Sequence, residues 1–204
     1  AYIKASNAGT ADLFGASLAL ASDGNTLAVG AIGESSNASG VGGDQTSNTA
    51  YSAGATYVFT RSGGVWSQQA YIKPLNGTDY DYLGSDGYFG FSVALSADGD
   101  RLAVGAIGDN EVLTGIGGAP TYGAGGGTMG AVYVFTRSSG AWALENYVKA
   151  SNTGQNAFFG HSVDLAADGN TMAVGAFGEG SNTTGVGGDQ PGYLASTSGA
   201  VYLY

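Results

Sequence analysis

The chain contains no cysteine, only three prolines, a single histidine and six basic residues against sixteen acidic ones. Without cysteine, neither a disulfide framework nor a thiolate metal site can form. The formal net charge of −10 would repel a phosphate backbone, so we expect no nucleic-acid partner. No apolar run approaches the length of a membrane span, so we also expect no membrane insertion.

Glycine and tyrosine are abundant instead, with 38 glycines and 13 tyrosines among the 204 residues. Together with frequent Ser, Thr and Asn, they favour short strands and tight turns over helices. An acidic, cysteine-free composition of this kind is typical of secreted surface proteins. We therefore expect an extracellular or cell-surface location.

One phrase occurs three times along the chain. It begins with Phe-Gly, continues through an Asp-Gly pair and an Ala-Val-Gly-Ala segment, and then reaches Gly-Ala-x-Tyr. An internal repeat of this kind predicts the architecture before any single residue is considered. The three copies begin at Phe14-Gly15, Phe89-Gly90 and Phe159-Gly160.

Each repeat predicts short antiparallel strands joined as a meander. The second strands are expected at 26–31, 101–106 and 171–176, the third at 55–60, 131–136 and 200–204, and the fourth at 66–73 and 142–149. The first strands, expected at 14–20, 89–95 and 159–165, alternate large and small residues at period two. The Asp23-Gly24 pair that follows predicts a type I′ hairpin turn. Tandem four-stranded meanders of this size predict an all-β fold of β-propeller blades. The expected blades are 14–73, 89–149 and 159–204, the last without a fourth strand, and residues 1–6 are an orphan fourth strand.

These residues resemble the FG-GAP repeats of integrin α-subunit propellers and of their bacterial and archaeal relatives. The Phe-Gly pairs, the Val-Gly-Ala segments and Gly130–Phe135 stand in the family's order over nearly the whole chain. The resemblance implies a β-propeller, extracellular placement, and adhesion or ligand binding through loops on one face. It does not carry over the family's calcium cage. The short hairpins offer at most two carboxylates, as in Asp98-Gly99-Asp100, whereas Ca²⁺ needs about six to eight oxygens.

A long loop follows the second strand of each repeat, at 32–53, 107–129 and 177–198. An acid stands early in each loop, and two of the loops share Gly-Val-Gly-Gly-Asp-Gln. One hypothesis is a rebuilt calcium site that uses these acids and backbone carbonyls. The alternative is that the acids are solvated and the glycines only permit tight backbone paths. The candidate ligands are Glu34, Asp44, Asp109, Glu179 and Asp189.

Three N-glycosylation sequons lie in the loops and begin at Asn37, Asn76 and Asn182. If modified, they would place sugars on one rim of the protein. The alternative is that loops rich in Asn, Ser and Thr produce such triplets by chance.

We expect no enzymatic activity. His161 stands close to Ser162 and Asp164, but adjacent residues of a strand point to opposite faces, so they form no triad. No phosphate loop, metal-ligand cluster or pair of catalytic carboxylates is present in the sequence.

The first and third repeats complement each other. Residues Ala1, Tyr2, Ile3, Lys4, Ala5 and Ser6 match the ends of the fourth strands at 70–73 and 147–151. The third strand of the last repeat has no fourth strand after it; its residues are Ala200, Val201, Tyr202, Leu203 and Tyr204. Three blades are also too few to close a ring, because propellers have about four to eight.

We therefore expect a structural protein that assembles head to tail. Residues 1–6 of one copy would complete the 200–204 edge of the next, giving a fibre or a six-bladed dimeric ring. One alternative is a ligand-binding propeller, an integrin-like adhesin or a lectin, whose partner is a cell-surface protein or a glycan. Another is that the chain is part of a longer polypeptide, which would make the offset an accident of truncation.

Overall fold

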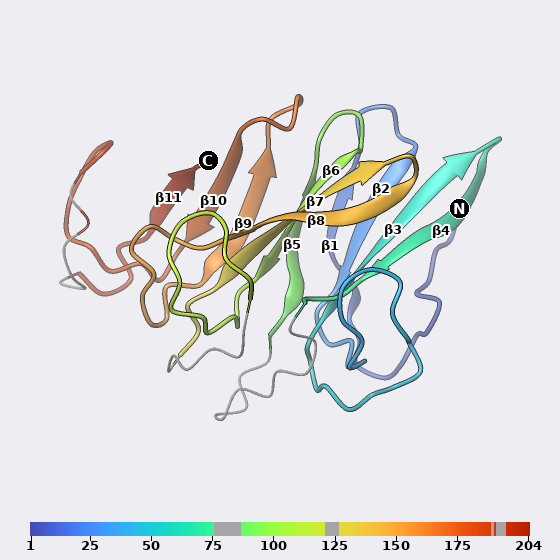
Figure 1. The fold of residues 1–204 in the computed structure, drawn as a ribbon, viewed down its shortest axis with the longest axis horizontal. Coiled ribbons are helices and arrows are strands. Elements are labelled where there is room, and N and C mark those ends of the chain that lie inside the picture. Colours follow the sequence, from blue (N-terminus) through green and yellow to red (C-terminus); the bar gives the residue numbers. More distant parts are fainter. Residues whose placement is uncertain (76–86, 121–126, 189, 191–194) are drawn as a thin grey trace.

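The structure is a computed structural model that describes residues 1–75, 87–120, 127–188, 190 and 195–204. It is an all-β fold of three antiparallel sheets with four, four and three strands, and the described residues contain no helix. The sheets stand side by side along the long axis of the molecule (Figure 1). The described part of the chain therefore has no helix that is long and apolar enough to cross a membrane.

Each sheet is a meander in which consecutive strands are hydrogen-bonded neighbours. The first sheet contains β1 (Phe14–Leu20), β2 (Thr26–Ala31), β3 (Ala55–Ser62) and β4 (Val65–Ile72). The second contains β5 (Phe89–Leu95), β6 (Arg101–Ala106), β7 (Ala131–Ser138) and β8 (Ala141–Val148). The third contains β9 (Phe159–Leu165), β10 (Met172–Ala176) and β11 (Ala200–Leu203). The expected orphan strand at residues 1–6 is not formed, because this segment pairs with none of the three sheets.

The hairpin turn between the first two strands differs from the type I′ turn expected from its Asp-Gly pair. Gly24 has a φ of 67°, but Asp23 keeps a negative φ, so only one of the two residues is left-handed. The Gly24 N–H donates to Ala21 O at 2.8 Å, and the Asp23 carboxylate accepts the Asn25 N–H at 2.8 Å. The result is a type I turn followed by a left-handed glycine, which the side-chain bond of Asp23 favours.

The sheets approach each other closely because glycines stand at their contacts. A Cβ atom at Gly30 of β2 would lie 2.0 Å from the carbonyl oxygen of Gly90 in β5. The Ser17 hydroxyl of β1 donates to the same oxygen at 2.7 Å. The corresponding contacts between the second and third sheets involve Gly105, Ser92 and Gly160. The repeat therefore determines the contact between sheets as well as the strands within them.

Apolar cores fill the space between successive sheets. Ile72 of the first sheet packs with Phe89 and Val93 of the second. Val132 of the second sheet packs with Phe159 and Val174 of the third. Burying one such side chain is worth about 1.5–3 kcal/mol. A sheet in this stack is thus stabilised mainly through the faces that it shares with its neighbours.

Candidate functional site

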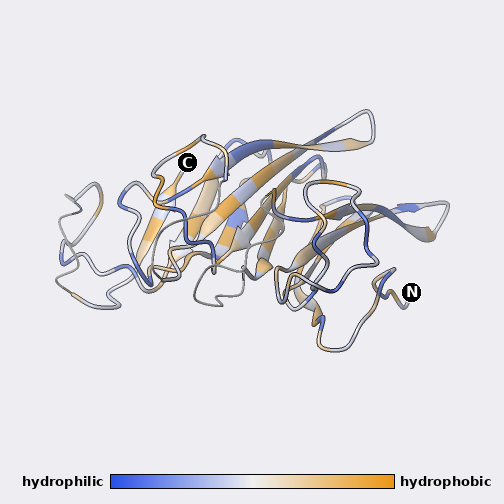
Figure 2. Cartoon of the chain, turned by 60° about the horizontal axis from the view of Figure 1, so that its bottom comes forward, coloured by the Kyte–Doolittle hydropathy of each residue, from blue (hydrophilic) through white to orange (hydrophobic). Residues whose placement is uncertain are grey.

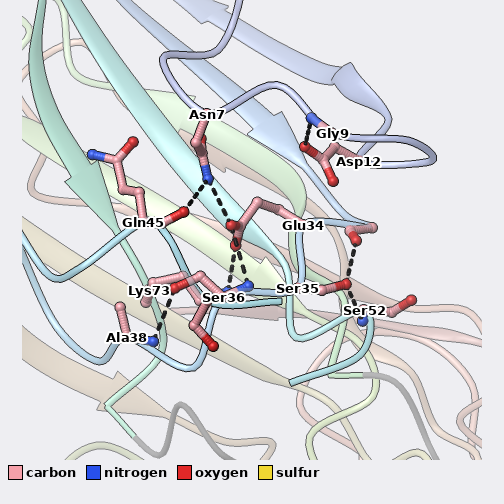
Figure 3. A network of polar contacts seen from close by, with 12 residues as sticks. Asn7, Gly9, Asp12, Glu34, Ser35, Ser36, Ala38, Gln45, Ser52 and Lys73 are labelled. Atoms are coloured by element: carbon pink, nitrogen blue, oxygen red, sulfur yellow. Dashed lines mark hydrogen bonds and ion pairs between the residues drawn. The ribbon is translucent and has the colours of Figure 1, made fainter. Parts of the chain in front are cut away.

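A buried ion pair in the first sheet joins the loop after β2 to the residue that follows β4. Glu34 begins the loop after β2, Lys73 directly follows β4, and Lys73 Nζ lies 2.6 Å from Glu34 Oε2. Neither side chain is more than 1% exposed. Burial lowers the pKa of Lys73, and the negative charge of Glu34 opposes that shift. The other carboxylate oxygen accepts Asn7 Nδ2 at 2.9 Å and the Ser36 N–H at 3.2 Å (Figure 3).

The second sheet repeats this arrangement with an aspartate. Lys149 Nζ lies 2.8 Å from Asp109 Oδ1, and the Tyr147 hydroxyl donates to the same oxygen at 2.8 Å. Burial raises the pKa of Tyr147, as does the nearby Asp109 charge, so the phenol stays a proton donor. In both sheets the lysine comes from the residue that follows the fourth strand.

The third sheet has the acid but not the lysine. Glu179 is 2% exposed and accepts Asn152 Nδ2 at 2.9 Å and the N–H and hydroxyl of Ser181, each at 2.9 Å. Among the residues that the structure describes, no basic group lies within ion-pair distance of Glu179. Burying a carboxylate without a counter-charge is costly, even when hydrogen bonds satisfy part of it.

Glu179 lies at the side of an open groove of about 540 Å³. The groove follows the free edge of β11, where β4 and β8 lie in the other two sheets. Val41 and Ile116 form isolated bridges to Ile72 and Val148, the last residues of those two strands. Val186, which holds the same repeat position, is fully exposed. The third sheet therefore presents a vacant position for a fourth strand.

The N-terminal residues lie against the opposite end of the molecule. Ala1–Lys4 line a cleft together with Trp66 and Phe59 of the first sheet. In the second sheet, Trp142 occupies the position of Trp66 and donates to Gln69 of β4 at 3.0 Å. Residues 1–4 thus lie beside the first sheet much as β4 lies beside the second. Figures 1 and 2 both place the N-terminus far from the C-terminus.

Both ends of the stack expose apolar side chains, although neither end face is uniformly apolar and bare. Ile3 and Ala5 pack over part of the first sheet's outer face, and the exposed Asp164 lies on the third sheet's outer face beside Ala173 and Leu203. On β1, Leu18 is 64% exposed, whereas Val93 at the same repeat position of β5 is 8% exposed. On β11, Val201 and Leu203 are 72% and 73% exposed, whereas Val132 on β7 is fully buried. The difference follows from position in the stack, because an equivalent residue is buried wherever a neighbouring sheet covers it.

The structure gives the proposed calcium ligands other partners. Lysines engage Glu34 and Asp109, while the exposed Asp44 accepts the N–H and hydroxyl of Thr46, bonds that lower the pKa of Asp44. Asp189 lies outside the described residues. Within the described ranges, no group of three or more His, Cys, Asp or Glu side chains could hold a metal ion. The calcium site stays a prediction from the sequence.

The other residues singled out in the sequence lie on the surface where they are described. Asn37 and Asn182 are exposed, and Asn76 lies outside the described residues. The exposed His161 packs beside Phe91 and Phe177, with ring centroids 5.1 and 4.6 Å away. Glycosylation of the sequons remains a prediction.

Sequence reasoning missed the role of the lysines, although a signal for it was present. The chain has three lysines, Lys4, Lys73 and Lys149, and all of them occupy one position of the repeat. Each of the three loops likewise has, as its third residue, an acid that the structure buries. Comparing the charges repeat by repeat would have paired two lysines with two acids and left Lys4 and Glu179 over.

Comparison with protein-family models and with curated proteins finds no match for the chain.

Proposed function

We propose that the three sheets are consecutive β-propeller blades of the FG-GAP type, and that the protein is a non-enzymatic, extracellular structural protein. It assembles head to tail, with the β11 end of one copy against the β1 end of the next. The observation that carries this proposal is the exposure pattern. Leu18 and Leu203 are exposed at the two ends of the stack, while their repeat equivalents are covered by a neighbouring sheet.

The two ends are complementary because each is one half of a contact that already occurs twice. Ser17 and Ser92 donate to the Gly90 and Gly160 carbonyls of the following sheet. The third equivalent, Ser162, is exposed, and the three atoms nearest to a Cβ added at Gly175 all belong to Ser162 of the same sheet. The matching glycine, Gly15, lies at the β1 end. A second copy would supply it.

The energetics favour stacking with strand pairing over strand pairing alone. About four new backbone hydrogen bonds at ~1 kcal/mol each do not offset an association cost of roughly 4–15 kcal/mol. Covering roughly 800 Å² per partner, at about 25 cal/mol for each Å² of apolar surface, supplies the remainder. A head-to-tail contact either closes into a ring or propagates as a fibre. Two copies would make six blades, a number within the usual range.

Charged substitutions on the two outer faces test this proposal. We expect wild-type chains to form oligomers, and we expect Leu18→Asp and Leu203→Asp each to give monomers, because either charge would be buried in the contact. Both leucines are more than 60% exposed in the single chain, so circular dichroism should show an unchanged fold. Val112→Asp, at a loop residue that is 59% exposed, is the matched control. Light scattering after size-exclusion chromatography measures the mass.

Mixing the two variants identifies the geometry of the contact. Each variant keeps one intact end, so an equimolar mixture should form dimers that grow no further. A face-to-face dimer would behave differently, because a chain carrying only Leu18→Asp would still pair through its β11 end. Wild-type chains that remain monomeric at every concentration would refute the proposal.

A further inference from the structure

We infer that Lys4 of one copy enters the groove of the next copy and forms an ion pair with its Glu179. This inference rests on the proposed head-to-tail assembly and names the contact that makes it specific. The groove along β11 would then hold Ala1–Lys4 of a second copy as its fourth strand. The partner is another copy of this chain.

The lysines and buried acids at one repeat position leave one cation and one anion without an ion-pair partner among the described residues. Lys73 and Lys149 each neutralise the buried acid that begins the long loop of their own sheet. Lys4 is the remaining lysine of the chain; it is exposed and forms no ion pair with any described residue. Glu179 is the remaining buried acid of this kind. One unpaired cation and one unpaired anion therefore stand at positions that are paired twice elsewhere.

The groove surrounds Glu179 with much of the environment that Glu34 has in the first sheet. Glu179 already receives Asn152 Nδ2, just as Glu34 receives Asn7 Nδ2, both at 2.9 Å. It differs from Glu34 at Oε2, which accepts the Ser181 hydroxyl at 2.9 Å and has no ammonium group of a described residue within bonding distance, on the side where the groove is open. Because the asparagine and backbone donors are already in place, a lysine entering along β11 would find its site largely preorganised.

The register of the incoming strand follows from the pairing of β3 with β4. Thr56 pairs with Ile72 and Tyr57 with Tyr71 between β3 and β4. The same rule places Ile3 opposite Val201 and Tyr2 opposite Tyr202. Tyr2, which is 89% exposed in the single chain, would then lie where Tyr71 and Tyr147 are buried in their sheets. Lys4 follows the strand as Lys73 follows β4, and this brings its ammonium group to Glu179.

The ion pair has to form between two copies of the chain. The segment that carries Lys4 packs on the first sheet beside Trp66. The groove belongs to the third sheet, and the two lie at opposite ends of the molecule (Figure 1). Remaining packed on its own first sheet, the segment would meet the β11 edge of the next copy when the two end faces stack. Stacking of the two end faces would therefore also bring the N-terminal segment to the β11 edge.

A double-mutant cycle on assembly tests the pair. We expect Lys4→Met to raise the dissociation constant about thirty-fold or more, because Glu179 would be enclosed without a cation. Glu179→Gln should weaken association for the converse reason, while its amide oxygen still accepts Asn152. The double variant should associate at least as well as Lys4→Met, because no buried charge is left unpaired. Sedimentation velocity over a concentration series measures the constants.

The outcomes separate this inference from the proposal beneath it. Lys4 is exposed, so Lys4→Met should fold normally, with circular dichroism as the check. A Lys4→Met chain that assembles as tightly as wild type would overturn the ion pair but leave head-to-tail assembly standing. Strictly additive effects in the cycle would overturn it as well. Assembly that requires added CaCl₂ but not Lys4 would assign the groove to a metal ion instead. Wild-type chains that never associate would refute both the ion pair and head-to-tail assembly.

Discussion

Replacing Lys73 with methionine is expected to lower the free energy of unfolding by about 3–5 kcal/mol, the usual cost of removing one partner of a buried ion pair. The Glu34 carboxylate would keep the bonds from Asn7 and Ser36 but lose the ammonium 2.6 Å away. Because Glu34 is only 1% exposed, water cannot take the place of that ammonium. Urea denaturation followed by circular dichroism measures the loss.

Two further variants show that the unpaired charge causes the loss. Adding Glu34→Gln to Lys73→Met removes the charge and keeps an acceptor for Asn7, so the double variant should recover part of the stability. Glu145→Gln breaks the Arg101–Glu145 pair, whose side chains are 28% and 35% exposed, and should cost less than about 1 kcal/mol. A Lys73→Met cost as small as that of Glu145→Gln would show that the buried pair contributes little.

Gly30→Ala is expected to destabilise the fold severely, at or above the upper end of the roughly 1–3 kcal/mol that overpacking costs. The added Cβ would lie 2.0 Å from the Gly90 carbonyl oxygen, a backbone atom that cannot rotate away. The first two sheets would have to separate, which would weaken the apolar core that they share. Thermal unfolding measures the effect.

Gly175→Ala is the matched control, because Gly175 holds the same position in the third sheet. The added Cβ would come within 3 Å of the Ser162 hydroxyl alone, and this side chain can rotate. We expect little loss of stability but complete loss of assembly, since a second copy would bring its Gly15 carbonyl against the new methyl group. If Gly175→Ala destabilises the single chain as much as Gly30→Ala does, or leaves assembly intact, this account of the sheet contact is wrong.

The strands were predictable because the same pattern of residue types marks them in each repeat. The expected first strands 14–20, 89–95 and 159–165 agree residue for residue with β1, β5 and β9. The Phe-Gly start and the alternation of large and small residues specify these limits. The orphan strand expected at residues 1–6 is absent, but the second, third and fourth strands differ by at most two residues at either end. Here the pattern of one sheet continues into the turn, as in β3, which extends to Ser62.

The buried ion pairs were not predictable from periodicity. Glu34 and Lys73 are 39 positions apart, and both lie just outside a strand, where a pattern of apolar residues predicts solvated loop. Only the path of the long loop brings the acid to the end of β4. An acid at the start of each loop therefore suggested a calcium ligand. Its true partner, the lysine, differs from an ordinary surface lysine only by its place in the repeat.

A disulfide between two copies is the most direct test of the central claim, which is that residues 1–6 of one molecule complete the third sheet of another. The chain has no cysteine, so any disulfide must join introduced thiols. Chains carrying Ile3→Cys and Val201→Cys are mixed under mild oxidation. Cross-strand partners lie within about 4.5–5.5 Å between Cα atoms, which a disulfide can span.

We predict a covalent heterodimer from the Ile3→Cys and Val201→Cys mixture on a non-reducing gel. Ser6→Cys is the register control, because three residues along a strand displace it by about 10 Å, beyond disulfide reach. No heterodimer from the first mixture, or equally rapid linkage from Ser6→Cys, would contradict completion of the sheet by a neighbouring molecule.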